Sequence, residues 1–340
     1  MASEIDVELM QRAIANAARS RFLASPNPWV GSVVAARDGT VFDGATRPPG
    51  GAHAERVALA AAGDHADGST VYTTLEPCSH TGRTGPCTDA LIEADVARVV
   101  VGILDPDPLV AGSGVAQLRA AGVAVEVGVC SADVEQQLEP YLHHRRTGRP
   151  LVVLKMALSL DGRTAAPDGS SQWITGPEAR SAVHRIRAES DAILVGAGTV
   201  RLDDPSLTVR DWHPGDDVEV GPAGLDPRRV VLGVVPTGAK VNPCTELSGS
   251  LPAVLDELGS QGVLQLLVEG GSQVAAQFHS GGLVDRYELF MAPAFFGGDD
   301  ARPLFAGSGA ASMDGLWRGT ITGVERVGVD LHVTVTASTA

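Results

Sequence analysis

The chain has 340 residues, of which 44% are hydrophobic and 20% are charged, as expected for a folded globular protein. This length predicts two domains, each of which can bury its own core. The formal net charge of −15 argues against a nucleic-acid partner, because nucleic-acid binders gain most of their affinity from basic surfaces.

The first half of the chain predicts alternating helices and strands, since apolar residues recur at helical spacing in some segments and run continuously in others. Asp6 is a candidate N-cap for the first helix, and the turn at 37–39 predicts a hairpin. The alternation predicts an α/β layer with a largely buried sheet. The expected helices cover 6–22, 53–62, 87–94, 115–121 and 132–146, and the expected strands cover 30–35, 40–42, 70–75, 98–104 and 123–129.

A domain boundary is expected where Thr147-Gly148-Arg149-Pro150 interrupts the last of these helices. We therefore place one domain at 1–147 and a second α/β domain at 151–340. Residues 211–228 are rich in Asp, Gly and Pro and are predicted to form a surface loop. In the second domain, buried strands are expected over 151–156, 193–196 and 264–269, and a helix over 273–278.

The sequence shows no pattern typical of export or of membrane insertion. Its first residues lack a basic region followed by an apolar stretch, and its apolar runs, such as 99–104, are too short to cross a bilayer. Four cysteines are too few for a disulfide framework, and Cys130 and Cys244 are interpreted as structural or free thiols. We expect a cytoplasmic protein without a membrane partner.

His53, Cys78 and Cys87 form a set of metal-ligand residues in the first domain. A catalytic zinc takes three protein ligands and keeps one position open for water, whereas a structural zinc usually takes four. Glu55, at the start of a predicted helix, can reach that water without binding the metal, as a general acid and base must. The sequence therefore predicts a mononuclear zinc deaminase site. A structural site with His80 as fourth ligand is the alternative.

The second domain lacks the Gly-x-Gly-x-x-Gly fingerprint of dinucleotide-binding folds. Two glycine-containing turns, 196–199 and 269–272, each follow a predicted buried strand and could bring backbone amides near a phosphate. Each turn is a weak indication alone, because small residues are common after strands. One predicted helix face is interpreted as solvated, with Arg187 only a weak phosphate candidate; its residues are Arg180, His184, Arg185 and Arg187.

The loop from Cys78 to Cys87 is longer than the Cys-x-x-Cys spacing of tRNA and cytidine deaminases. It resembles the deaminase domain of the bifunctional deaminase–reductases of riboflavin biosynthesis, whose motif is Pro-Cys-x-His-x-Gly-x-x-Pro-Pro-Cys. Gly85 replaces the first proline of the closing pair here. The resemblance includes Pro26-Asn27-Pro28 and Asp105-Pro106-Asp107-Pro108, where the family usually has Asn in place of Asp107.

The stretch from 151 to about 310 resembles the reductase domain of the same family, through segments 155–162, 173–176, 191–210 and 269–271. Two such matches in the expected order are more specific than either alone. The resemblance implies a cytidine-deaminase-like α/β/α domain followed by a dihydrofolate-reductase-like α/β domain.

The resemblance implies a bifunctional enzyme. Its first domain would use Zn²⁺ to deaminate 2,5-diamino-6-ribosylamino-4(3H)-pyrimidinone 5′-phosphate by hydrolysis, and its second would use NADPH to reduce the ribosyl group to ribityl. The implied partner is thus a small phosphorylated pyrimidine, and we expect a homo-oligomer, either a dimer or a tetramer.

The resemblance also implies roles for single residues. Glu55 would be catalytic, and Asp203 would either donate a proton or position the cofactor. The implied NADPH contacts are Ala157, Trp173, Thr199, Asp203 and Gly271. The implied substrate contacts are Asn27, His80 and Arg83 in the first domain and Lys155, Ser171, Leu207, Arg210 and Glu269 in the second.

Plainer interpretations stay open for several of these residues. Asn27 lies in an Asn-Pro turn, Arg83 suits a solvated loop, Trp173 suits a packing aromatic, and Asp203 suits a turn cap before Pro205. Two rival functions also remain: a nucleic-acid base deaminase with an accessory domain, and a ligand-binding or regulatory protein with a degenerate reductase half.

Overall fold

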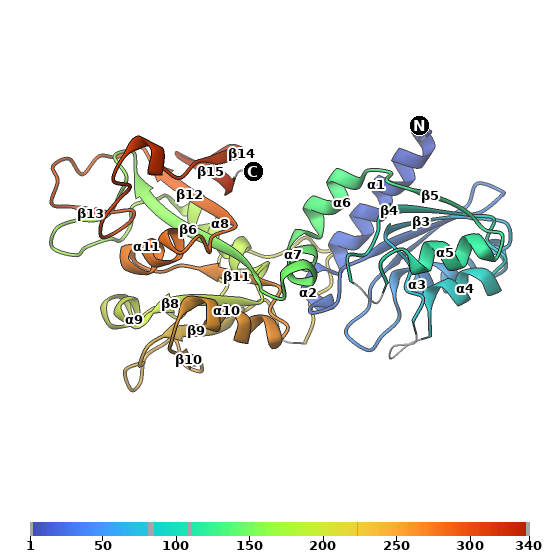
Figure 1. Cartoon of the computed structure of the whole chain (residues 1–340), viewed down its shortest axis with the longest axis horizontal. Coiled ribbons are helices and arrows are strands. Elements are labelled where there is room, and N and C mark those ends of the chain that lie inside the picture. The colour runs from blue at the N-terminus through green and yellow to red at the C-terminus, as the bar shows by residue number, and fades with distance from the viewer. Residues whose placement is uncertain (1–2, 81–84, 108–109, 223, 338–340) are drawn as a thin grey trace. The chain divides into compact units, whose positions relative to one another are not determined.

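The structure, a computed structural model, describes residues 3–80, 85–107, 110–222 and 224–337 (Figure 1). The chain forms two compact units. The first unit comprises Met1–Gly148 and Pro214–Gly224, and the second comprises Arg149–His213 and Leu225–Ala340.

The first unit is built on a five-stranded sheet with strand order β2-β1-β3-β4-β5. Strand β1 is antiparallel to both β2 and β3, whereas β3, β4 and β5 are mutually parallel neighbours. Parallel neighbours need crossover connections, and helices supply them here. The strands are β1 Gly31–Ala35, β2 Val41–Ala45, β3 Thr70–Leu75, β4 Arg98–Ile103 and β5 Ala124–Val127.

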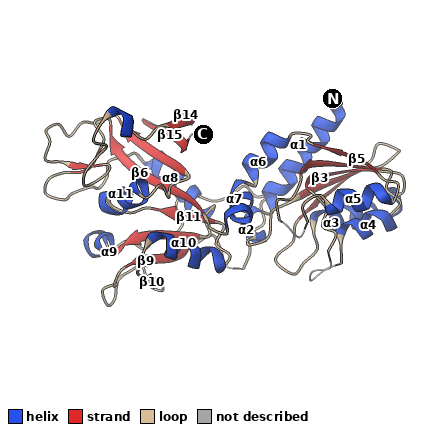
Figure 2. Ribbon diagram, viewed as in Figure 1, coloured by secondary structure: helices blue, strands red, loops and turns tan. Residues whose placement is uncertain are grey.

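Helices cover both faces of this sheet (Figure 2). Successive strand residues point to opposite faces, so Val33 packs in one core with α1 and Val34 in another with α3, α4 and α5. The α-helices are α1 Glu4–Arg19, α2 Arg21–Ala24, α3 Ala54–Ala62, α4 Cys87–Glu93, α5 Ser113–Ala120, α6 Ser131–Gln137 and α7 Glu139–Thr147, with a 3₁₀ helix at Gly63–Ala66.

Two predictions about the helix ends were wrong. The N-cap of α1 is Ser3, not Asp6: the Ser3 hydroxyl accepts the Asp6 N–H, and the Asp6 carboxylate accepts the Ser3 N–H at 3.1 Å. The same carboxylate pairs with Arg98 at 2.7 Å, which holds the pKa of Asp6 well below its usual range. The predicted helix over 132–146 is two helices, α6 and α7, with Pro140 in the first turn of α7, where its missing N–H costs nothing.

The second unit is built on an eight-stranded sheet with order β10-β9-β8-β11-β6-β12-β15-β14. The strands from β10 to β12 are parallel, and β15 and β14 are antiparallel additions at one edge. The strands are β6 Leu151–Ser159, β8 Ala192–Gly196, β9 Arg228–Leu232, β10 Thr245–Leu247, β11 Gln265–Val268, β12 Arg286–Ala292, β14 Gly319–Val327 and β15 Asp330–Ala337; β7 Arg163–Ala165 and β13 Arg302–Pro303 form a separate pair.

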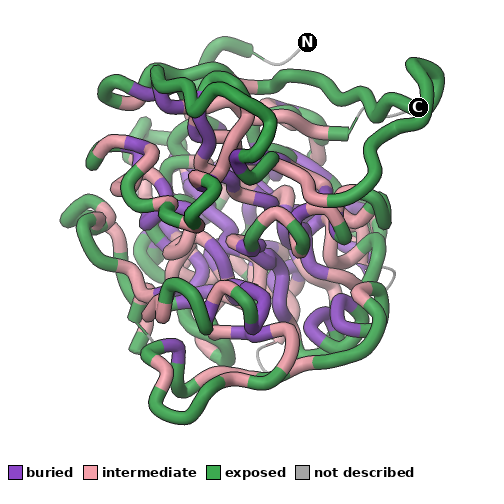
Figure 3. Tube along the Cα trace, turned by 90° about the vertical axis from the view of Figure 1, so that its left-hand side faces the viewer, coloured by how far each residue is buried: buried purple, intermediate pink, exposed green. Residues whose placement is uncertain are grey.

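Helices again cover both faces of the sheet. Val152 and Leu154 face α10 and α11, whereas their neighbour Val153 faces α8 and α9. Figure 3 shows the buried stretches as purple tube enclosed by exposed green segments. The helices are α8 Pro177–Ala188, α9 Ala197–Asp203, α10 Leu251–Ser260 and α11 Ser272–Ser280, with a 3₁₀ helix at Met313–Gly315.

The predicted surface loop over 211–228 has a more specific arrangement than the sequence indicated. Its central part, Pro214–Gly224, packs within the first unit. Glu219 donates its backbone N–H to Arg19 and pairs its carboxylate with Arg47 at 2.9 Å, and Gly221 N donates to Phe22 O. These partners are about 170 to 200 positions away in sequence, so local patterns could not identify them.

Candidate functional site

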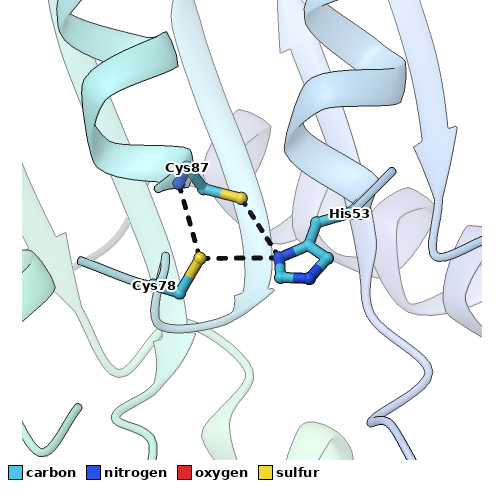
Figure 4. Close-up of side chains that lie close together, drawn as sticks. All are labelled: His53, Cys78 and Cys87. Atoms are coloured by element: carbon cyan, nitrogen blue, oxygen red, sulfur yellow. Dashed lines mark hydrogen bonds between the residues drawn. The ribbon is translucent and has the colours of Figure 1, made fainter. Parts of the chain in front are cut away.

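Three metal-ligand atoms converge in the first unit (Figure 4). His53 Nδ1 lies 3.5 Å from Cys78 Sγ and 3.4 Å from Cys87 Sγ, and the three atoms all lie within 4.8 Å of one another. Tetrahedral zinc bonds of about 2.0–2.3 Å require ligand atoms roughly 3.3–3.8 Å apart. The donor set and its spacing therefore fit a zinc ion with one open coordination position.

The local fold explains how the three residues meet. His53 is the N-cap of α3, Cys87 is the first residue of α4, and Cys78 lies three residues after the end of β3. The positive ends of helix dipoles favour thiolate ligands. Hydrogen bonding from the Cys87 thiol lowers the pKa of Cys78, and the Cys78 thiolate in turn raises the pKa of Cys87. A divalent cation between the two sulfurs would stabilise both as thiolates.

Glu55 is placed to handle protons at this site. It is the second residue of α3, and only 3% of its surface is exposed. Burial raises the pKa of Glu55 to about 6. A carboxyl group that can both take and release a proton near neutral pH suits general acid–base catalysis.

The remaining residues predicted for the first site are Asn27, His80 and Arg83. Asn27 is half-buried in the turn after α2, where its backbone N–H donates to Ala24 O. His80 is exposed and is not part of the metal-ligand cluster found among the described residues, which favours three ligands over four. Arg83 lies outside the described residues.

The second unit contains a cavity of about 940 Å³. It lies over the carboxyl ends of β6, β8 and β11, where ligands of open parallel sheets usually bind. Of the residues predicted from the sequence, those that line it are Lys155, Ala157, Ser171, Trp173, Thr199, Asp203, Arg210, Glu269 and Gly271. Leu207 is buried beside them, in the core under α8 and α9.

Two helices begin at this cavity. The turn at 196–199 opens α9, with Gly196 as N-cap, and Gly271 is the N-cap of α11. The first backbone N–H groups of a helix have no partner within the helix, and they can bind an anion such as a phosphate. Gly270 must be a glycine, because a Cβ there would lie 2.5 Å from Val274 Cβ. This glycine-lined edge and the cavity volume fit a dinucleotide cofactor.

A largely buried ion cluster, with side chains 10% to 16% exposed, forms the wall of the cavity around Glu269. Arg187 pairs with both oxygens of Glu269 at 2.7 and 2.9 Å, and Lys155 Nζ lies 3.8 Å from Glu269 Oε2. Burial alone would raise the pKa of Glu269, but the charges of Arg187 and Lys155 outweigh it and bring the pKa to about 2. Glu269 is therefore ionised at neutral pH.

The predicted solvated face of α8 was wrong for three of its four residues. Arg180, His184 and Arg187 line the cavity, and only Arg185 is on the surface, in an exposed pair with Glu189. His184 accepts the Arg210 N–H at 3.2 Å. The signal that could have identified this face is the spacing of 180, 184 and 187, which places all three on one side of a helix.

One alternative for a single residue can now be decided. Trp173 is not a packing aromatic, because its surface is 67% exposed and its ring lies under the Arg180 guanidinium at 4.7 Å. Asp203 ends α9 facing the cavity, and desolvation raises its pKa despite the nearby charge of Arg302.

The family comparisons agree with this geometry. Residues 3–103 match the cytidine and deoxycytidylate deaminase zinc-binding region, and residues 150–333 match the RibD C-terminal domain. The riboflavin biosynthesis protein RibD of Chlamydia trachomatis is 40% identical over 89% of this chain and 88% of its own length. The Escherichia coli protein of the same name is 38% identical over 86% of this chain and 89% of its own length.

Solved structures agree as well. Acinetobacter baumannii RibD, form 1, is 36% identical with a TM-score of 0.90, and the match covers 98% of this chain and 99% of that one. A diaminohydroxyphosphoribosylaminopyrimidine deaminase / 5-amino-6-(5-phosphoribosylamino)uracil reductase from Thermotoga maritima is 31% identical with a TM-score of 0.86, with the same coverage.

Fold, site and comparisons together define a two-domain enzyme, in which a cytidine-deaminase-like zinc domain precedes a dihydrofolate-reductase-like, NADPH-dependent domain. The chain belongs to the RibD family of bifunctional deaminase–reductases of riboflavin biosynthesis. This result argues against both rival functions. Within the described part of the chain, every helix is too short or too polar to span a bilayer.

The ion cluster generates a prediction about stability and pH. Glu269→Gln should leave Arg187 and Lys155 buried without their counter-charge, at a cost of about 3–5 kcal/mol near neutral pH. Because the folded-state pKa of Glu269 is lowered, its contribution is complete above the unfolded value of about 4.3 and is lost as the pH falls through about 2. Urea unfolding of the wild type and of the Glu269→Gln variant, at decreasing pH, measures the difference in their free energies of unfolding.

The matched control is Glu189→Gln, which removes the exposed pair with Arg185 and should cost less than about 1 kcal/mol. A difference between Glu269→Gln and the wild type that stayed constant down to the lowest pH would contradict the assigned ion cluster.

Proposed function

We propose that the first unit removes the 2-amino group of the diaminopyrimidine ribosylamine phosphate by hydrolysis, and that the second reduces the ribosyl group of the product to ribityl with NADPH. The observation that carries the proposal is the cluster of His53, Cys78 and Cys87 beside the buried Glu55. The name of the Thermotoga maritima relative gives the same two reactions for that protein.

In the first unit, we assign His53, Cys78 and Cys87 as zinc ligands. When bound, zinc supplies the Lewis acidity that activates water for attack on the pyrimidine ring. Glu55 takes a proton from the attacking water and delivers one to the departing amino group, and its raised pKa supports this exchange. Asn27, His80 and Arg83 are assigned as substrate contacts on the resemblance alone.

In the second unit, the hydride comes from NADPH, and the protein binds and orients both reactants. The cofactor contacts we assign are Ala157, Trp173, Thr199, Asp203 and Gly271, and their common position along the cavity supports them. Asp203 could hold a proton there, since desolvation raises its pKa.

The substrate contacts we assign in the second unit are Lys155, Ser171, Leu207, Arg210 and Glu269. An acidic protein needs local cations for an anionic substrate, and the cavity supplies them. Arg210 suits a phosphate clamp because it is exposed at the cavity and donates to Ser206 Oγ at 2.7 Å, which orients its guanidinium. We add Arg187 to the residues of this site because its ion pair with Glu269 keeps that carboxylate ionised.

We also propose that the chain works in the cytoplasm as a homo-oligomer, a dimer or a tetramer. Thiolate zinc ligands need reduced cysteines, which the cytoplasm maintains. Strand β14 supports self-association, because it is an edge strand on which Ile321 and Val324 are 62% and 60% exposed. Light scattering of the full chain tests the assembly, and a monomer at micromolar concentration would contradict it.

The two activities should be separable. Cys78→Ala, or chelation of zinc, is expected to stop ammonia release while NADPH-dependent reduction of pre-deaminated substrate continues. The reason is that the proposed ligands lie in the first unit and the cavity residues in the second. Ammonia release and NADPH oxidation are measured on the same preparation.

Cys244→Ala is the control for this experiment. Cys244 lies outside the metal-ligand cluster and contacts Asn242, so the variant should retain both activities. Loss of both activities in a folded Cys78→Ala chain would contradict two independent sites.

Glu55→Gln tests the proton-transfer role directly. The variant should keep its zinc, since Glu55 is not a ligand, but should deaminate about 10²–10⁴-fold more slowly, because an amide cannot exchange protons. Zinc content is measured beside ammonia release. Glu93→Gln, an exposed position on α4, is the control. Near-normal turnover with zinc retained would remove Glu55 from this role.

A further inference from the structure

Two chain segments meet at the edge of the first sheet that carries the metal ligands. Strands β3 and β4 are parallel neighbours, with Leu75 opposite Ile103, so the segments that follow them leave the sheet at the same edge. After β3 comes Glu76, and after β4 comes Asp105. Cys78 follows two residues after Glu76, so whatever holds these two segments together also places a proposed zinc ligand.

The carboxylate of Glu76 holds the segments together. It is buried, with 4% of the residue exposed, and it accepts three backbone N–H groups. Oε2 accepts from Asp105 at 3.2 Å and from Gly112 at 2.9 Å, and Oε1 accepts from Val115 at 3.1 Å. Three N–H donors offset much of the desolvation of a buried carboxylate.

Two of these donors belong to the start of helix α5. Gly112 is the N-cap of α5 and has no side chain that could cap it, and Val115 is in its first turn. Glu76 therefore accepts the N–H groups that an N-cap side chain would otherwise accept, although it is not part of the helix. Its negative charge also lies at the positive end of the helix dipole.

The first turn of α5 lies directly against the segment that bears Cys78. A Cβ on Gly114 would lie 2.0 Å from Pro77 O, so helix and segment are in backbone contact. On the other side of Cys78, the hydroxyl groups of Ser79 and Ser113 are hydrogen-bonded at 2.7 Å. The helix therefore touches the residue before Cys78 and the residue after it.

Helix α5 also contacts the helix that begins with Cys87. Thr88 N donates to Cys78 O at 3.2 Å, and the Thr88 hydroxyl lies 2.9 Å from Gln117 Oε1. Gln117 Nε2 in turn donates to Asp89 at 2.7 Å. Through these contacts α5 is fixed to both cysteine-bearing segments.

We propose that Glu76 is a positioning residue of the zinc site, which docks α5 against the Cys78 segment and so sets the positions of both thiolate ligands. The inference rests on the proposed assignment of Cys78 and Cys87 as ligands. Glu76 does not act on substrate, because its carboxylate is occupied by backbone N–H groups. It acts through α5.

Glu76→Gln in the full chain tests the inference. The amide keeps the shape of the carboxylate, but its NH₂ group must face at least one of the three N–H donors, so the docking of α5 is lost in part. With cobalt(II) in place of zinc, we expect altered ligand-field and thiolate-to-metal absorption. With zinc, the kcat of ammonia release should fall about tenfold to 100-fold, the effect of a misplacement of about 1 Å. Reduction of pre-deaminated substrate should be unchanged.

Asp6→Asn is the matched control. Asp6 is also a buried carboxylate in the first unit, capped by the Ser3 N–H and paired with Arg98, but it lies at α1. This variant should lower the melting temperature and leave both the cobalt spectrum and kcat unchanged. If Glu76→Gln behaved in the same way, Glu76 would only stabilise the fold and the inference would be overturned.

Gln117→Ala tests the same contacts from the other end, in case Glu76→Gln does not fold. It removes the link from α5 to Thr88 and Asp89 and should change the cobalt spectrum and lower kcat several-fold. An unchanged spectrum and kcat would overturn the inference. A wild-type chain whose cobalt form lacked thiolate-to-metal absorption would instead overturn the ligand assignment itself, which is a separate result.

Discussion

Parallel strand pairing is the constraint on which both candidate sites depend. Parallel neighbours leave the sheet at the same edge, so residues far apart in sequence become neighbours there without any direct attraction between them. In the first unit this places Glu76 and Asp105 together beyond β3 and β4. In the second it places Lys155 on β6 beside Glu269 after β11. The strand pairing places the site residues at one edge of each sheet. The helices that begin at these edges add the positive ends of their dipoles and backbone N–H groups that have no partner within the helix.

Three glutamates with little exposed surface show how the surroundings of one side-chain type change what it can do. Burial is the main cause that raises the pKa of Glu55 to about 6, which suits a group that exchanges protons. The Glu269 side chain is 10% exposed, and the charges of Arg187 and Lys155 outweigh its desolvation, so its pKa falls to about 2 and it stays charged. The carboxylate of Glu76 accepts three backbone N–H groups, which suits a positioning role.

Membership of the RibD family places the two units in one biosynthetic context. Both proposed reactions act on one phosphorylated pyrimidine skeleton, which explains why an acidic chain lines its second cavity with cations. These cations are Lys155, Arg180, Arg187, Arg210 and Arg302. Arg187 and Lys155 are partly neutralised by Glu269, whereas Arg210 is held by a neutral hydroxyl and keeps its full charge for a ligand.

The zinc chemistry could be predicted from the sequence, because residue type and short spacing identify His53, Glu55, Cys78 and Cys87. Local apolar runs likewise predicted all five strands of the first sheet, but only β6, β8 and β11 of the second. Three features became visible in the folded chain alone: His184 and Arg187 face the cavity, Ser3 rather than Asp6 caps α1, and Glu76 accepts N–H groups from the start of α5. Helical periodicity shows which residues share a face, but what that face meets depends on the packing of segments distant in sequence, which local pattern does not encode.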